Sequence, residues 1–376
     1  MRMKLIYKTN MMNNFNFKKQ ALVILSAFVL VLGACKKDKL PPIDPQPSAT
    51  TGVYVLCETG YGKIGTITYY EVNTGAAIQD YYKKQNGIDL GVNTSDLKQY
   101  GSKMYAVVTG TDKASKDSYI DVMSIATGKS LKRIPFSDAT SGFLPRYIAF
   151  YKNKAYVSGY DGYVTRIDTA GLTVESRLQV GGALEQLTIV NGKLYVTNSA
   201  HFMYATSNNS SVSVVDLNNF NKLKDIPVGF NPTKISATGS GELFVVTRGN
   251  YGNISPSLDK LSSVSDTKTG TEALDVEYLN ITGNKGFVIG PYGNEFLKNI
   301  NVSSGVLGTD FVTDATPVIL PYAVTVNPLS NDIFVSDANG YALVGKTFCF
   351  GADGKKKFEF ATGGSPQSAV FKYSYK

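Results

Sequence analysis

A short strand carrying a tyrosine or phenylalanine recurs seven times along the 376-residue chain, and this repeat limits the fold more than any other feature. The recurring aromatic residues are Tyr54, Tyr105, Tyr156, Tyr195, Phe244, Phe287 and Phe334. Successive copies are separated by 51, 51, 39, 49, 43 and 47 residues. Spacing in this range is typical of the four-stranded blades of a β-propeller.

Other short segments recur with the same period. A first segment, such as 146–150, lies about ten residues before the aromatic strand, and an alternating segment that often ends in Asp, such as 211–216, follows it. A turn and an outer segment, such as 226–229, complete the copy. Alternation with a period of two between Gly, Asn and Asp residues predicts strands, and we expect no helical stretch to compete with them. The fold class predicted is all-β.

The first and last copies of the repeat predict how the sheets close into a ring. No first strand precedes Val53, whereas 364–371 has the pattern of a first strand without the rest of its blade. We therefore expect a seven-bladed β-propeller over 51–376, in which the C-terminal strand completes the N-terminal blade. Such closure leaves no long free sheet edge.

The first 34 residues have the pattern of a secretory signal. Basic residues precede an apolar run at 21–32 that is too short to span a bilayer. The sequence Leu-Gly-Ala-Cys at 32–35 is similar to the bacterial lipobox, and this resemblance implies cleavage before Cys35 and lipidation of its thiol. The alternative is an ordinary secretory signal with a chance cysteine. Residues 35–50 contain four prolines and are expected to form an extended tether.

Removal of this leader changes the charge of the chain. Five Lys or Arg residues and no acidic residue precede Cys35, so the remaining chain has 33 basic against 30 acidic residues and its net charge falls from +8 to +3. A nucleic-acid-binding protein would need a dense basic face. We therefore expect no nucleic-acid partner.

The repeat also resembles a known family. Gly-x-x-Pro at blade starts, Leu-Tyr-Val at 194–196, Val-Ser-Val-Val-Asp-Leu at 212–217 and Ile-Pro-Val-Gly at 226–229 are similar to the YncE-like seven-bladed propellers. With the lipobox, the chain resembles the surface lipoproteins of that group, some of which are associated with capture of ferric siderophores. The resemblance implies a lipid-anchored outer-membrane protein at the cell surface, with a TonB-dependent transporter as partner.

Residues on which enzymes rely are few. His201 is the one histidine, and neither a Gly-x-Ser-x-Gly elbow nor a phosphate-binding loop is present. We predict no cofactor and assign no metal site, although Asp96, Glu185 and Asp275 could converge on Ca²⁺. Cys57 and Cys349 lie in adjacent predicted blades, so the sequence is compatible with two free thiols and also with a disulfide between them.

Loops on one face of a propeller surround its central channel, and this is where we expect binding. Tyrosine supplies a stacking face with a polar tip, and arginine pairs directionally with oxyanions. The candidate ligand-binding residues are Tyr61, Lys63, Arg146, Tyr160, His201, Tyr204, Lys234, Arg248, Tyr251, Tyr292, Tyr322 and Tyr341. An aromatic face with a few cations and little acid suits a small anionic, hydroxyl-rich aromatic ligand.

Three functions are compatible with these features. The first is a membrane-anchored binding lipoprotein that captures an anionic aromatic ligand, with a ferric catecholate siderophore as its most specific form, for handover to an outer-membrane transporter. The second is a cell-surface propeller that binds a glycan or a protein without catalysis. The third is a metal-dependent lactonase or lyase.

Overall fold

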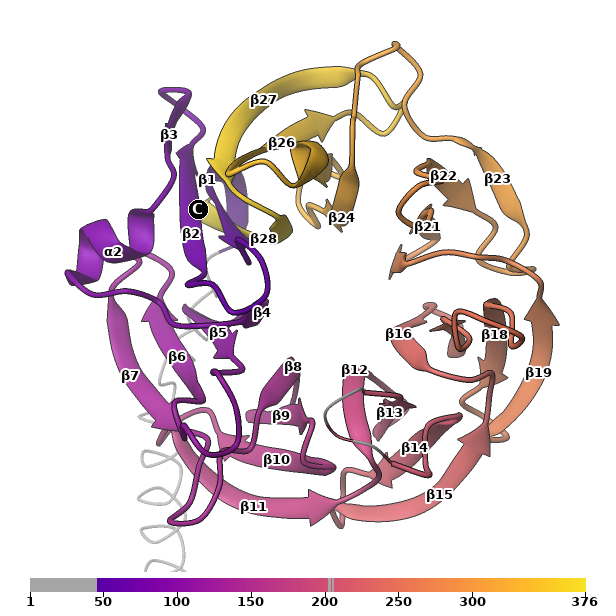
Figure 1. The fold of residues 1–376 in the computed structure, drawn as a ribbon. Helices are drawn as coiled ribbons and strands as arrows, with labels where there is room; N and C mark the ends of the chain where they lie inside the picture. The colour runs from indigo at the N-terminus through magenta and orange to yellow at the C-terminus, as the bar shows by residue number, and fades with distance from the viewer. Residues whose placement is uncertain (1–45, 202–203, 205) are drawn as a thin grey trace, which may run out of the picture. The chain divides into compact units, whose positions relative to one another are not determined.

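The computed structural model describes residues 46–201, 204 and 206–376, and Pro47–Lys376 form one compact unit. Within these described residues, the strands form seven four-stranded antiparallel sheets. The sheets are arranged as blades in a ring (Figure 1). The predicted all-β, seven-bladed propeller is thereby confirmed.

Blade 1 joins the two ends of the described chain. From the channel outwards it contains β28 (Pro366–Tyr375), β1 (Pro47–Cys57), β2 (Thr66–Glu71) and β3 (Ala76–Ile78). The C-terminal strand pairs antiparallel with β1, with Val53 opposite Phe371. The predicted completion of the N-terminal blade by the C-terminal strand is confirmed. Because β1 begins at Pro47, it includes the last four residues of the range 35–50 that the sequence assigns to a tether.

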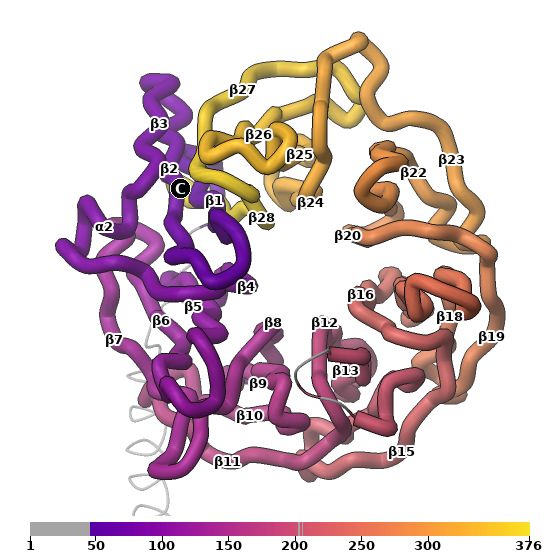
Figure 2. Tube along the Cα trace, viewed as in Figure 1, coloured from indigo at the N-terminus to yellow at the C-terminus, as the bar shows by residue number. Residues whose placement is uncertain are grey.

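The other six blades also run from an innermost strand at the channel to an outermost strand at the rim. Blades 2 and 3 consist of β4 (Thr94–Tyr100), β5 (Lys103–Val108), β6 (Tyr119–Ser124) and β7 (Ser130–Pro135), then β8 (Pro145–Tyr151), β9 (Lys154–Gly159), β10 (Tyr163–Asp168) and β11 (Thr173–Gln179). Blades 4 and 5 consist of β12 (Ala183–Val190), β13 (Lys193–Ser199), β14 (Ser211–Asp216) and β15 (Asn221–Pro227), then β16 (Pro232–Ala237), β17 (Glu242–Thr247), β18 (Ser257–Ser262) and β19 (Thr267–Glu272). Blades 6 and 7 consist of β20 (Tyr278–Thr282), β21 (Lys285–Ile289), β22 (Leu297–Ile300) and β23 (Leu307–Asp310), then β24 (Pro321–Val326), β25 (Ile333–Asp337), β26 (Val344–Phe350) and β27 (Lys356–Gly363). Figure 2 shows the innermost strands following one another around the ring, with β28 in contact with both β24 and β4.

The recurring aromatic residue of each second strand packs between its own blade and the next. All seven aromatic residues are buried, with exposed fractions between 0% and 3%. Tyr54 of blade 1, for example, packs with Leu97 of blade 2, and Phe334 of blade 7 packs with Val53 of blade 1. Burial of a side chain of this size contributes roughly 2 kcal/mol. The residues that form the sequence repeat are therefore the residues that join the blades.

A short helix, α2 (Tyr81–Asn86), lies between blades 1 and 2, where no helix is expected from the sequence. Asp80 caps its first turn, and Gly87 ends it in the left-handed conformation at φ 70°. Tyr82 is buried, and its hydroxyl donates a hydrogen bond to Oδ2 of Asp121 at 2.7 Å. The expectation of no helix is wrong for these residues, because less than two turns are too short to produce a visible periodicity.

The two cysteines of the described chain are free thiols. Cys57 and Cys349 are both buried in the packing between blades 1 and 7. Burial raises the pKa of Cys57 to about 11 and that of Cys349 to about 12, so both thiols are protonated at neutral pH. Of the two possibilities left open by the sequence, the structure has the free thiols.

The predicted signal peptide (1–34), the lipidation site Cys35 and the tether up to residue 45 lie outside the described residues. Among the residues that are described, no helix has the length and hydrophobicity needed to cross a membrane.

Candidate ligand-binding site

The turn that begins a blade places a residue in the left-handed conformation directly before the innermost strand. The φ angle is 55° at Asn93, 51° at Leu144, 60° at Asn231 and 49° at Ser365. Asparagine tolerates this conformation, whereas it costs Leu144 on the order of 1 kcal/mol. The strained backbone at Leu144 therefore marks a turn whose shape is imposed by its surroundings.

Each of these turns holds one residue of the neighbouring loop at the mouth of the channel. The backbone carbonyl of the left-handed residue accepts a hydrogen bond from the backbone N–H of the residue that directly follows the second strand of the same blade. The four bonds are 3.0–3.1 Å long and join Ser365 to Glu58, Asn93 to Thr109, Leu144 to Tyr160 and Asn231 to Arg248. The backbone of the residue after the second strand is thus held in the same way in these four blades, while its side chain differs from blade to blade.

One cavity of about 540 Å³ lies where these loops meet, and we call it the loop-face cavity. Seven of the predicted ligand-binding residues line it, namely Tyr61, Arg146, Tyr160, His201, Tyr204, Tyr322 and Tyr341. The remaining lining residues are Glu58, Gly60, Asn93, Thr94, Thr109, Gly110, Thr111, Leu144 and Ser365. The structure therefore brings residues from five of the seven blades into one site.

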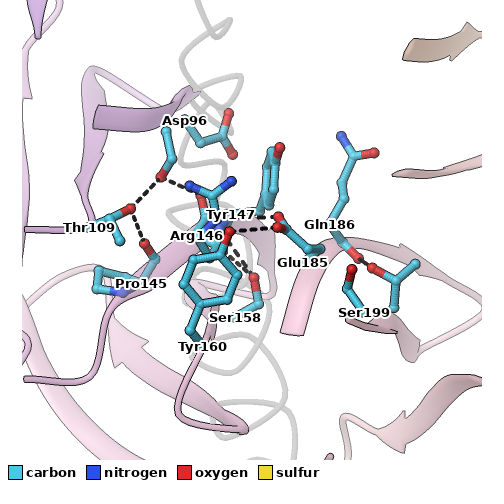
Figure 3. Close-up of polar contacts among 12 residues, drawn as sticks. Asp96, Thr109, Pro145, Arg146, Tyr147, Ser158, Tyr160, Glu185, Gln186 and Ser199 are labelled. Carbon is cyan, nitrogen blue, oxygen red and sulfur yellow. Dashed lines mark hydrogen bonds and ion pairs between the residues drawn. The ribbon is translucent and has the colours of Figure 1, made fainter. Parts of the chain in front are cut away.

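Arg146, the second residue of β8, is held by a carboxylate in the wall of this cavity. Its Nε donates to Oε2 of Glu185 at 3.2 Å, and the Tyr160 hydroxyl donates to Oε1 of the same carboxylate at 2.7 Å (Figure 3). Burial lowers the pKa of Arg146, but Glu185 and Tyr160 raise it by more, so the guanidinium stays charged. Among the described residues, its two terminal nitrogens have no hydrogen-bond acceptor.

Three rings from blades 3 and 4, those of Tyr160, His201 and Tyr204, form one wall, which we call the aromatic wall. The His201 ring centroid lies 4.3 Å from that of Tyr160 and 4.8 Å from that of Tyr204. The ammonium of Lys113 lies 4.7 Å from the centroid of the Tyr204 ring. Burial lowers the pKa of His201, so its imidazole is neutral at pH 7 and offers a stacking surface without a charge.

Blades 1 and 7 supply the side of the cavity across the ring. The Tyr322 hydroxyl donates to Oε2 of Glu58 at 2.8 Å, and the ring of Tyr341, in the 3₁₀ helix η1 (Asn339–Tyr341), lies edge-on to that of Tyr322 at 6.2 Å. Burial raises the pKa of the Glu58 carboxyl, while the hydrogen bond from Tyr322 and the charge of Arg146 oppose this rise. A carboxyl group is thus present on a face that the sequence predicts to contain little acid.

Two predicted binding residues have partners away from the loop-face cavity. Arg248 is 8% exposed, and its guanidinium donates to Asp275 at 2.9 Å, to the carbonyl of Val276 at 2.7 Å and to Glu277 at 2.8 Å. These bonds hold the loop that leads into blade 6. Lys234 lies inside the channel, where its ammonium donates to the Tyr147 hydroxyl at 2.5 Å. Neither residue lines the cavity.

The other three predicted residues do not line the cavity either, and all three are exposed. Lys63 is exposed, Tyr251 is 81% exposed and Tyr292 is 69% exposed. The ring of Tyr292 lies 5.8 Å from that of Tyr341, which does line the cavity. Tyr251 and Tyr292 therefore present their rings to solvent.

Glu58 and Thr109 are the cavity residues most clearly missed by the sequence interpretation. Both directly follow the second strand of a blade, as Tyr160 and Arg248 do. Comparing this single position across the seven copies of the repeat would have identified them. The sequence prediction rests on the aromatic and basic residues of these loops, so it does not include an acidic and a hydroxyl residue.

The three acids proposed as Ca²⁺ ligands do not converge. Asp96 accepts hydrogen bonds from the backbone N–H groups of Leu97 and Ile148, Glu185 is paired with Arg146, and Asp275 is paired with Arg248. Over the described part of the chain, no group of three His, Cys, Asp or Glu side chains is placed to hold a metal ion. The convergence of these acids is therefore not found.

Comparison with known proteins identifies the fold. No family model and no curated protein matches the chain. A quinonprotein alcohol dehydrogenase-like protein from Bacteroides thetaiotaomicron is 15% identical with a TM-score of 0.62, over 86% of this chain and 78% of that one. A candidate 6-phosphogluconolactonase from Bacteroides uniformis is 12% identical with a TM-score of 0.61, over 86% and 100%. Dihydro-heme d1 dehydrogenase NirN in complex with DHE is 10% identical with a TM-score of 0.56, over 89% and 78%.

At these identities the likeness shows the fold alone. The protein is a seven-bladed β-propeller, and its structural neighbours carry names from different classes of enzyme. One fold supports many functions, so function has to be argued from the site.

Proposed function

We propose that this protein is a binding protein without a catalytic role, and that it holds one small aromatic ligand with anionic and hydroxyl groups in the loop-face cavity. The observation that carries the proposal is the arrangement of Arg146. Glu185 orients its guanidinium through Nε, while the two terminal nitrogens in the cavity wall have no acceptor within the described chain. A ligand oxyanion would complete these hydrogen bonds, because guanidinium pairs directionally with such groups.

The size and walls of the cavity support a small planar ligand. A volume of about 540 Å³ falls within the range of about 300–1,000 Å³ that is common for small-molecule sites. The aromatic wall offers stacking surfaces on one side, and Tyr341 offers another across the ring. Each stacking, cation–π or charge-assisted contact contributes on the order of 1–2 kcal/mol, so several together would give useful affinity.

A ferric catecholate siderophore is the most specific form of this proposal. Catecholate rings are planar, and their complexes with iron are anionic and expose oxygen acceptors, which suits Arg146 and Lys113 beside the aromatic wall. The Glu58 carboxyl could in addition accept a hydrogen bond from a ligand hydroxyl or donate one to it. The choice of a siderophore over other aryl anions rests on the family resemblance seen in the sequence.

The proposal includes a membrane anchor at Cys35 and a partner at the outer membrane. A lipidated Cys35 would hold the propeller at the cell surface, where a TonB-dependent transporter could receive the ligand. We expect a radioactive fatty acid to label the parent chain and not the Cys35→Ala variant. Equal labelling of both chains would contradict the anchor.

The test of the binding function is a titration of the purified propeller with an iron-loaded catecholate siderophore. Because the chain has no tryptophan, tyrosine fluorescence is the intrinsic signal. We expect saturable quenching, and a loss of affinity of about tenfold or more in Arg146→Met, since a charged hydrogen bond contributes about 1.5–3 kcal/mol. Lys224→Met, on the exposed outer strand β15, serves as the matched control.

Two outcomes would overturn this assignment in different ways. If no iron-loaded siderophore binds but a neutral oligosaccharide does, with sensitivity to Tyr204→Ala and not to Arg146→Met, the protein is a glycan-binding propeller. If the protein hydrolyses a lactone and loses this activity in Glu58→Gln, it is an enzyme, as the names of its lactonase-like neighbours suggest.

A further inference from the structure

A second cavity of about 350 Å³ lies at the other end of the central channel, and we call it the far-end cavity. The innermost strands begin at the loop-face cavity, which Thr94 and Arg146 line near the starts of β4 and β8. Lys98 and Phe150, near the ends of the same two strands, line the far-end cavity. Residues of β12, β16 and β20 complete its wall, so five consecutive blades contribute.

Three side chains in this cavity have their acceptor oxygens in use by the protein. The two carboxylate oxygens of Asp96 accept backbone N–H groups at 3.0 and 3.1 Å. The side-chain oxygen of Gln186 accepts the N–H of Ile235 at 2.9 Å, and that of Asn280 accepts the hydroxyl of Thr282 at 3.0 Å. These three side chains are thereby fixed in orientation, and their oxygens are turned to the protein.

Three donor groups of the same cavity have no hydrogen-bond acceptor within the described chain, whereas the amide of Gln99 donates to the carbonyl of Gly101 at 3.1 Å. The Lys98 ammonium lies 3.7 Å from Oδ1 of Asp96, which is longer than a hydrogen bond, and its side chain is 45% exposed although strands surround it. The side-chain amide nitrogens of Gln186 and Asn280 have no acceptor in the described chain. The Lys98 ammonium and these two amide groups can therefore donate to an anion.

A further cation lies next to this wall inside the channel. The Lys234 ammonium donates to the hydroxyl of Tyr147, which itself lines the far-end cavity, and lies 5.9 Å from the centroid of the Tyr278 ring. Glu185 and Glu58 are the acids whose charges also reach Lys234, and Glu185 has both oxygens occupied by Arg146 and Tyr160. The local charge at this end is therefore positive, with Lys98 and Lys234 set against Asp96.

From this arrangement we infer that the far-end cavity is a binding site for a small oxyanion, a carboxylate or phosphate group, held by Lys98 and by the amide nitrogens of Gln186 and Asn280. The site is separate from the loop-face cavity and does not depend on the function proposed for it. A ligand oxygen at this position would meet one ammonium and two amide donors, each already positioned by the hydrogen bonds of its own residue.

The experiment is a calorimetric titration of the propeller at low ionic strength with inorganic phosphate and, separately, with succinate. We expect saturable binding of at least one probe, and a loss of affinity of roughly tenfold or more in Lys98→Met. Asn280→Ala, which keeps the charge, is expected to weaken binding by a smaller factor. Lys224→Met on the outer strand is the matched control, and its affinity should equal that of the parent protein.

The outcomes separate this inference from the binding function of the other cavity. Lys98→Met should leave the titration with iron-loaded siderophore unchanged, and Arg146→Met should leave phosphate and succinate binding unchanged. Absence of saturable binding by both probes would overturn the inference. So would an equal loss in Lys98→Met and Lys224→Met, because it would show only a general charge effect. Thermal melting of each variant checks that it is folded.

Discussion

The two cavities at the ends of the channel share the innermost strands β4 and β8, yet they differ in what they offer a ligand. The loop-face cavity is lined mostly by residues of connecting loops, and the buried ion pair that Arg146 of its wall forms with Glu185 is closed by Tyr160. The far-end cavity is lined by strand residues, and its ion pair between Lys98 and Asp96 is left open at 3.7 Å. The comparison shows that the loops supply the aromatic side chains of the loop-face cavity, whereas the strands supply the ammonium and amide donors of the far-end cavity.

The two arginines predicted to bind ligand make the same point within one face. Arg146 lies in an innermost strand and Arg248 directly follows a second strand. Arg248 uses both terminal nitrogens on Asp275, Glu277 and a backbone carbonyl. Arg146 uses only Nε. A guanidinium is available to a ligand only where the neighbouring blade supplies too few acceptors to occupy it.

The largest expected effect comes from breaking the closed ion pair. Glu185→Ala leaves a buried guanidinium without its partner and should destabilise the fold by about 3 kcal/mol, since the Arg146 and Glu185 side chains are only 19% and 12% exposed. Urea unfolding measures the change. Anion binding at the far end should stay within about twofold, because Glu185 does not line that cavity.

The controls for this variant use a second pair and a double exchange. Glu359→Ala removes exposed contacts with Lys346 and Lys356 and should cost at most about 0.5 kcal/mol. Replacing Arg146 and Glu185 together by leucine should recover much of the stability without restoring ligand binding. A loss below about 1 kcal/mol in Glu185→Ala would contradict the view that the closed pair supports the loop-face cavity.

A smaller effect is expected from the pH dependence of Glu58. Because burial raises the pKa of this carboxyl above its ordinary value of 4.5, the folded protein holds the proton more tightly than the unfolded chain. The contribution of this proton to stability is present below pH 4.5 and is lost as pH rises through the folded pKa, at no more than about 1.4 kcal/mol per pH unit.

Comparison with the Glu58→Gln variant isolates the contribution of the Glu58 proton to the free energy of unfolding. The groups that face Glu58 are Tyr322, Arg146, Lys234 and Gln367. The amide variant keeps the hydrogen bond with Tyr322 but cannot titrate, so the difference in unfolding free energy between the two proteins should change in the stated direction across this range. Identical pH profiles would show that the Glu58 carboxyl is not perturbed by its position.

The smallest effect is expected at Tyr251, outside the loop-face cavity. Tyr251→Ala should change stability by no more than about 0.5 kcal/mol and ligand affinity by less than about twofold, because its ring is 81% exposed and lies outside the cavity. Tyr204→Ala, in the aromatic wall, should weaken binding more. Equal losses of affinity in the two variants would show that the ligand reaches Tyr251 as well as the cavity.

Much of the fold follows from the sequence because propeller blades are built from short-range patterns. Alternation along each strand reports which side chains are buried, and the seven recurring aromatic residues mark the contacts between blades. The single C-terminal strand pattern at 364–371 was enough to predict its pairing in blade 1. The helix α2 was missed because six residues with a cap at Asp80 leave no periodicity to detect.

The repeat pattern is sufficient to predict the all-β blades, the closure of the ring and the loops from which the loop-face cavity is built. The packing of the blades determines which of the predicted residues share that cavity, pairs Arg248 with acceptors in the loop that leads into blade 6, and brings Glu58 into the site. The reason is physical: the partner of a charged side chain comes from another blade, as Glu185 does for Arg146 across 39 residues. No local pattern encodes such a pairing, because it depends on where the packed blades place each turn.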